Sequence, residues 1–106
     1  MPFRLALLTF LFAASTAVAE TPTANVTIRN RVFEPKEVSV PAGQKVELRV
    51  RNEDAAAAEF ESHELRREKV VPAGQEVVLN IGPLKAGRYE FYDDFNPKSR
   101  GHIVAK

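Results

Sequence analysis

The fold is decided by the stretch Val38–Val50, which reads VSVPAGQKVELRV. Apolar residues alternate with polar ones on both sides of a Pro-Ala-Gly turn at residues 41–43. Alternation with a period of two is typical of a strand that has one buried face, and Pro and Gly mark turns between strands. This stretch therefore predicts two strands that are joined by a turn.

The same pattern recurs outward from this stretch in both directions. The tetrapeptide PAGQ returns at residues 72–75 and is again followed by an alternating run. Short alternating runs separated by turn residues are typical of antiparallel sandwiches and barrels. We therefore predict an all-β Greek-key sandwich of about seven to eight strands. The helix-tolerant stretch Ser62–Lys69 is expected to be an excursion between strands. The further alternating runs are Val26–Ile28, Val77–Ile81 and Tyr89–Phe91.

Residues 1–19 have a different character from the rest of the chain. Arg4 precedes an apolar run, and Ala17-Val18-Ala19 follows it, which is the pattern of a secretory signal peptide. The alternative is an uncleaved membrane anchor, but Thr and Ser interrupt the run, and it falls short of the ~20 residues that span a bilayer. We predict cleavage after Ala19, a single domain over residues 20–106, a periplasmic location and no stable membrane insertion after cleavage.

The charge balance and the lack of cysteine exclude several classes of function. The chain has 15 Lys and Arg and 14 Asp and Glu, so removal of Arg4 leaves a balanced domain. A balanced charge gives no reason to expect nucleic acid as a partner. There is no cysteine, which excludes disulfides and thiolate metal ligands. The chain also has no nucleophile–base pair and no Gly-rich phosphate loop, so no hydrolase or transferase motif is present.

Much of the chain resembles one known family in the order and spacing of its residues. Phe33-Glu34-Pro35 and Val38–Gly43 resemble the F-x-P-x-x-(V/I)-x-V-P-A-G opening of cupredoxin-like domains. Pro83–Tyr92 resembles the approach to the metal-binding loop of that family. The resemblance covers nearly the whole chain after residue 19 and implies a β-sandwich, in agreement with the alternation.

The resemblance also locates the ligands of a blue copper site, and this chain lacks all of them. Such a site uses one cysteine thiolate, two imidazoles and usually a methionine. The matching positions hold Ala58, Asp93, Asn96 and, at the methionine position, about Ser99. The one methionine is Met1, within the predicted signal peptide. A blue copper electron carrier is therefore excluded.

A second motif resembles a subgroup that lacks the blue copper ligands. Phe60–Val70, followed by Pro72-x-Gly74, resembles the F-E-S-x-x-L-x-x-E-K-V stretch of EfeO-type domains. This resemblance implies periplasmic binding of copper or iron beside an iron permease or other iron-uptake components, with ferrous oxidation as a further role that the sequence does not decide. Many members carry a histidine before the proline of the last loop, where this chain has Asn96.

Side chains alternate between the two faces of a strand, and this alternation assigns the acidic residues that could serve as metal ligands to one face or the other. Asp93 shares a face with Phe91, whereas Asp94 lies on the other face. Oxygen donors with at most two imidazoles suit iron, or Cu(II) with modest affinity. In the topology of the cupredoxin-like family the end of the strand that carries Glu59 and Glu61 lies near the last loop, so the resemblance implies that three carboxylates converge, Glu61, Asp93 and Asp94. Three further residues are available as ligands, Glu59, His63 and His102.

Each of these residues also has an interpretation without a metal. The two aspartates would cap the turn before Pro97 by accepting backbone N–H bonds. Glu59 and Glu61 would form a solvated strand face, and the two histidines would be surface residues. The matching alternative for function is a metal-free β-sandwich that docks on a membrane permease or on another periplasmic protein.

Overall fold

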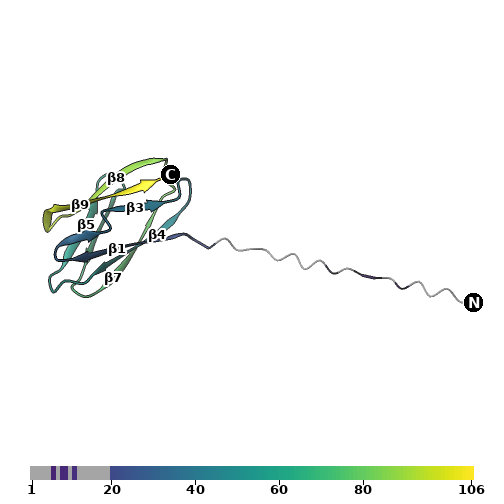
Figure 1. Cartoon of the computed structure of the whole chain (residues 1–106), viewed down its shortest axis with the longest axis horizontal. Coiled ribbons are helices and arrows are strands. Elements are labelled where there is room, and N and C mark those ends of the chain that lie inside the picture. The colour runs from purple at the N-terminus through teal and green to yellow at the C-terminus, as the bar shows by residue number, and fades with distance from the viewer. Residues whose placement is uncertain (1–5, 7, 10, 12–19) are drawn as a thin grey trace, which may run out of the picture.

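Nine strands and no helix make up the part of the chain that the computed structural model describes, residues 6, 8, 9, 11 and 20–106 (Figure 1). The strands are β1 (Thr23–Arg29), β2 (Val32–Glu34), β3 (Glu37–Val40), β4 (Val46–Asn52), β5 (Ala58–Ser62), β6 (Arg67–Val71), β7 (Glu76–Ile81), β8 (Gly87–Asp93) and β9 (Asn96–Ala105). The prediction of an all-β sandwich is confirmed, although the number of strands is higher than seven to eight.

The strands form two sheets with the orders β2-β1-β4-β7 and β3-β9-β8-β5-β6. Most neighbours are antiparallel, but β1 pairs with β4 and β3 pairs with β9 in parallel. The antiparallel pairing that the alternation indicates therefore holds for the other neighbours but not for these two pairs. The two parallel pairs arise because the chain passes from β2 in the first sheet to β3 in the second and then back to β4.

The stretch Ser62–Lys69 is a hairpin rather than a helix-tolerant excursion. Its turn joins β5 to β6, which pair antiparallel from Ala58↔Val71 to Ser62↔Arg67. The Ser62 hydroxyl accepts the Leu65 N–H at 3.1 Å and donates to the Glu90 carbonyl at 2.6 Å, so it ties the turn to the neighbouring strand β8. Sequence reasoning missed β6 because four of its five residues are exposed and it lacks alternation.

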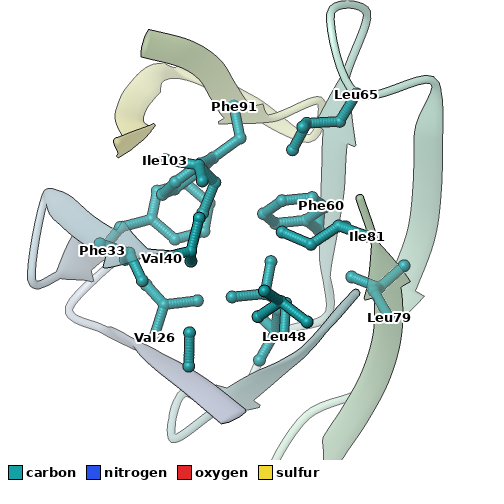
Figure 2. Close-up of a cluster of buried hydrophobic side chains, with 14 of the residues drawn as sticks. Val26, Phe33, Val40, Leu48, Phe60, Leu65, Leu79, Ile81, Phe91 and Ile103 are labelled. Carbon is teal, nitrogen blue, oxygen red and sulfur yellow. The ribbon is translucent and has the colours of Figure 1, made fainter. Parts of the chain in front are cut away.

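Three phenylalanines from different strands form the centre of the core (Figure 2). Phe33, Phe60 and Phe91 are each at most 1% exposed. Phe33 packs edge-on against Phe91 with ring centroids 4.8 Å apart, and Phe60 lies 5.1 Å from Phe91. Edge and tilted contacts of this kind stabilise a core beyond the effect of burial alone. They join both sheets, because Phe33 belongs to β2 and the other two belong to β5 and β8.

The two copies of PAGQ both form turns that place their glycine in the left-handed region, but their hydrogen bonds differ: the Gln75 N–H donates to the Pro72 carbonyl, whereas the Gly43 N–H donates to the Leu84 carbonyl. Gly43 and Gly74 have φ of 76° and 69°, a region that glycine occupies without a steric penalty. Each turn leads into a strand, and the two strands, β4 and β7, pair with each other from Val46↔Ile81 to Arg51↔Glu76.

The loop after β4 is organised by one buried side chain. Asn52 is fully buried, and its amide donates to the carbonyls of Ala56 and Val71 while its oxygen accepts the Asp54 N–H. Asp54 in turn accepts the N–H groups of Asn30 and Arg31, each at 2.8 Å. These bonds hold the β1–β2 turn against the loop that leads to β5.

The signal peptide predicted for residues 1–19 lies outside the described residues, apart from residues 6, 8, 9 and 11. Within the described part of the chain, no helix is long and apolar enough to cross a membrane.

Candidate metal centre

The positions that match the blue copper ligands lie together at one end of the sandwich, and their side chains are occupied by other contacts. Ala58, Asp93 and Asn96 line a cavity of about 20 Å³, room for about one water molecule. Asp93 is 4% exposed, and its Oδ1 accepts the N–H groups of Glu59 at 2.9 Å and Phe95 at 3.0 Å. Asp93 thus closes the turn after β8, as a capping residue does.

Asn96 and the fourth position, Ser99, are bonded to the β1–β2 turn. The Ser99 hydroxyl donates to the Arg31 carbonyl, and the Asn96 amide lies 3.4 Å from the same oxygen. Across the described residues, no buried side-chain nitrogen or oxygen lacks a hydrogen-bond partner. The four positions supply a methyl group, a carboxylate that already accepts two hydrogen bonds, an amide and a hydroxyl. This set does not fit a blue copper ion, which needs a thiolate and two imidazoles.

A different set of carboxylates converges on the outer face of the five-stranded sheet. One oxygen from each of Glu59, Glu61 and Asp94 lies within 4.8 Å of the other two. Glu59 and Glu61 share this face because they are two residues apart on β5, while Phe60 between them points into the core. Asp94 joins them because its N–H donates to the Glu59 carbonyl at 2.9 Å, just past the end of β8. We call these three residues the carboxylate cluster.

The cluster holds unfavourable negative charge. Glu68 lies opposite Glu61 on β6, so a fourth carboxylate flanks the cluster. A hydrogen bond with Glu68, burial, and the charges of Glu68, Asp94 and Glu61 together raise the pKa of Glu59 to about 7. Neighbouring carboxylates favour a proton on one member of such a group, and a cation relieves the same repulsion.

A tyrosine and a histidine border the cluster. The His63 Nε2 lies 2.7 Å from the Tyr92 hydroxyl and 4.0 Å from the Glu61 Oε1. The pKa of Tyr92 is raised by burial and by the negative charges of Glu61 and Asp94. The Arg100 guanidinium lies 4.8 Å from the centre of the Tyr92 ring on the same face of the sheet. An imidazole and a phenol are therefore available beside the carboxylates.

The structure divides the six predicted ligands into two groups. Glu59, Glu61 and Asp94 come together, with His63 beside them. Asp93 points into the sandwich and is bonded to backbone N–H groups, in accordance with the turn-capping interpretation. His102 pairs with Glu90 at 3.8 Å and is not a member of the cluster.

Sequence reasoning missed two residues that border the cluster, Glu68 and Tyr92. Tyr92 shares a strand face with Asp94 by parity, so that signal was present in the sequence. Glu68 required the pairing of β5 with β6, which the sequence did not reveal.

Comparisons with known proteins agree with the fold. A profile of the cupredoxin-like domain matches residues 3–105. An uncharacterized protein of Rickettsia prowazekii (strain Madrid E) is 41% identical over 80 residues, which is 74% of this chain. The chain spans 64% of the length of that relative.

Several solved structures share the fold at low sequence identity. Amicyanin from Paracoccus versutus has a TM-score of 0.62 at 18% identity, with 85% of this chain and 87% of amicyanin covered. Auracyanin A, a blue copper protein of Chloroflexus aurantiacus, has a TM-score of 0.69 at 15% identity, with 82% and 100% covered. The metal-binding domain of the Cu(I)-exporting P-type ATPase CopA of Streptococcus pneumoniae has a TM-score of 0.67 at 15% identity, with 82% and 96% covered.

Proposed function

Because this chain belongs to the cupredoxin-like domain family, we propose that it is an exported metal-binding protein of the EfeO type that handles copper or iron during bacterial iron uptake. The proposed location is the periplasm, and the proposed partner is an iron permease or another periplasmic iron-uptake protein. The predicted signal peptide and the motif at residues 60–70 support this part of the proposal.

The single observation that carries the metal-binding proposal is the convergence of Glu59, Glu61 and Asp94 within 4.8 Å. Carboxylate oxygens are ligands for hard and borderline cations, and a cation at this point would relieve the repulsion that raises the pKa of Glu59. His63 supplies a nitrogen donor beside Glu61. Bound copper would supply a one-electron acceptor there, which is the chemistry that assistance in ferrous oxidation requires.

The direct test is a calorimetric titration of the metal-free domain, residues 20–106, with Cu(II), with Fe(II) under anaerobic conditions and with Fe(III). We expect saturable binding of at least one of these ions. The double variant Glu61→Gln/Asp94→Asn should bind at least about tenfold more weakly, which corresponds to about 1.4 kcal/mol.

A matched control makes the same change in charge on the opposite sheet. Glu47 and Glu76 both face Arg49 on the outer face of the four-stranded sheet, so Glu47→Gln/Glu76→Gln should leave metal binding unchanged. The absence of saturable binding, or an equal loss in both variants, would overturn the metal-binding proposal.

The second candidate function is a metal-free docking module, and one observation favours it. The positions that match the blue copper ligands are filled by side chains that hydrogen-bond to the backbone, so the fold is closed there without a metal. Co-purification with a membrane partner in the presence of a chelator would favour this candidate, whereas strict dependence on metal would exclude it.

A further inference from the structure

A basic groove lies between β2 and the first half of β9, away from the carboxylate cluster. Its volume is about 240 Å³, and it is lined by Val32, Phe33, Lys36, Lys98, Ser99 and Arg100. We call it the basic groove. Phe33 belongs to the core and forms its floor, whereas Val32 is 38% exposed at its rim.

The two lysines of the basic groove carry charge that the described residues do not neutralise. Lys36 and Lys98 are exposed and form no salt bridge within residues 20–106, whereas Arg100 is bonded to Glu90. Glu34 lies close in sequence to Lys36, but its carboxylate is directed to Arg29, at 3.5 Å. The groove therefore presents two free ammonium groups to a ligand.

One wall of the basic groove is a strand edge without a neighbouring strand. β8 pairs with one edge of β9, including Tyr92↔Arg100. On the other edge, pairing with β3 begins only at Glu37↔His102, where the His102 N–H donates to the Lys36 carbonyl at 2.7 Å. Backbone groups of alternate residues in a strand point to the same side, so those of Arg100 point toward the groove as those of His102 point toward Lys36. Beyond Arg100 the register of β9 against β8 shifts, and residues 97–99 have no partner on β8.

We propose that the basic groove binds an extended, acidic segment of a partner protein by strand addition to the open edge at Lys98–Arg100. In this mode of recognition the backbone supplies hydrogen bonds and alternate side chains supply specificity. Carboxylates of the segment would lie on Lys36 and Lys98, and an apolar side chain would cover Val32. A small oxyanion would use the lysines but neither the strand edge nor the exposed valine, so the groove favours a peptide.

The test uses a defined probe, the blocked pentapeptide acetyl-Glu-Val-Glu-Val-Glu-amide, and a neutral twin with Gln in place of Glu. The ¹⁵N-labelled domain of residues 20–106, which contains all nine strands, is titrated with each peptide and followed by amide chemical shifts. We expect saturable shifts at residues 32–36 and 98–101, with the amides of β5 unmoved. The neutral twin should bind at least fivefold more weakly, and binding of the acidic peptide should weaken as salt is added, because salt screens exposed charges.

Two charge-reversal variants separate the groove from the general charge of the domain. Lys36→Glu/Lys98→Glu should reduce the affinity for the acidic peptide at least tenfold. Lys45→Glu/Lys85→Glu makes the same change at two exposed lysines outside the groove and should reduce it less than twofold. The dispersion of the amide spectrum shows whether each variant is folded.

Three results would overturn the proposal. They are the absence of localised shifts, an equal loss of affinity in both double variants, and equally strong perturbation of the same amides by inorganic phosphate, which would make the groove a small-anion site. None of these results depends on the carboxylate cluster, so this proposal and the metal-binding proposal fail separately.

Discussion

Asp93 provides the sharpest test of the distinction between a structural carboxylate and a metal ligand. It occupies the position that matches the cysteine of a blue copper site, yet its Oδ1 accepts the backbone N–H groups of Glu59 and Phe95. We expect Asp93→Ala to destabilise the fold and to weaken metal binding far less than the loss of a ligand would, because the Asp93 side chain is buried and is not a member of the carboxylate cluster.

The size of this effect follows from the two hydrogen bonds. Bonds to a charged group contribute about 1.5–3 kcal/mol each when their loss leaves a buried donor unpaired. Glu59 is 9% exposed and its N–H would remain unpaired, at a cost of about 2 kcal/mol. Phe95 is 55% exposed, so water can replace part of its bond, and about 1 kcal/mol is lost there. The sum of about 3 kcal/mol lowers the unfolding midpoint by about 12–24 °C in a domain of this size.

The matched variant Asp93→Asn keeps an acceptor oxygen in the same place and loses only the charge. It should cost about 1.5 kcal/mol, half of the loss in Asp93→Ala, because neutral hydrogen bonds are roughly half as strong as charged ones. Thermal unfolding followed by circular dichroism gives both values, and calorimetric titration with Cu(II) gives the affinity. If Asp93→Ala weakened Cu(II) binding tenfold while its unfolding midpoint stayed at that of the wild type, Asp93 would be a ligand and this reasoning would be refuted.

Two further predictions concern stability. The pKa of Glu59 is raised from 4.5 to about 7 in the folded state, so its stabilising contribution is complete below about pH 4.5 and is lost as the pH rises to about 7. The unfolding midpoint should therefore fall less between pH 5 and pH 8 in Glu59→Gln than in the wild type, and parallel pH profiles would contradict the assignment. In Gly101→Ala, the added Cβ would lie 2.5 Å from the Phe91 ring and 2.8 Å from the Lys36 carbonyl, both of which are held in place by packing or backbone. We expect a loss of about 1–3 kcal/mol in urea unfolding, and wild-type stability would show that the contact relaxes.

The sequence by itself determined the fold class and excluded blue copper chemistry. Alternation of side chains is a local property of extended backbone, so runs such as Val46–Val50 predict which residues face the core without knowledge of their neighbours. This reasoning did not predict β2, which is three residues long, or β6, which is mostly exposed. The sequence has no cysteine and no methionine after residue 1, and this excludes a blue copper site in any arrangement of the strands.

Only the tertiary structure decided which carboxylates meet. Parity placed Glu59 and Glu61 on one face and separated Asp93 from Asp94, but it did not reveal which strand lies beside β5. The contact between the Asp94 N–H and the Glu59 carbonyl, and the β5–β6 register that places Glu68 opposite Glu61, set the composition of the cluster. The same holds for the basic groove, because Lys36 and Lys98 both line it although they are 62 positions apart in the chain. Such contacts join residues distant in the chain, and they depend on strand register, which no local pattern encodes.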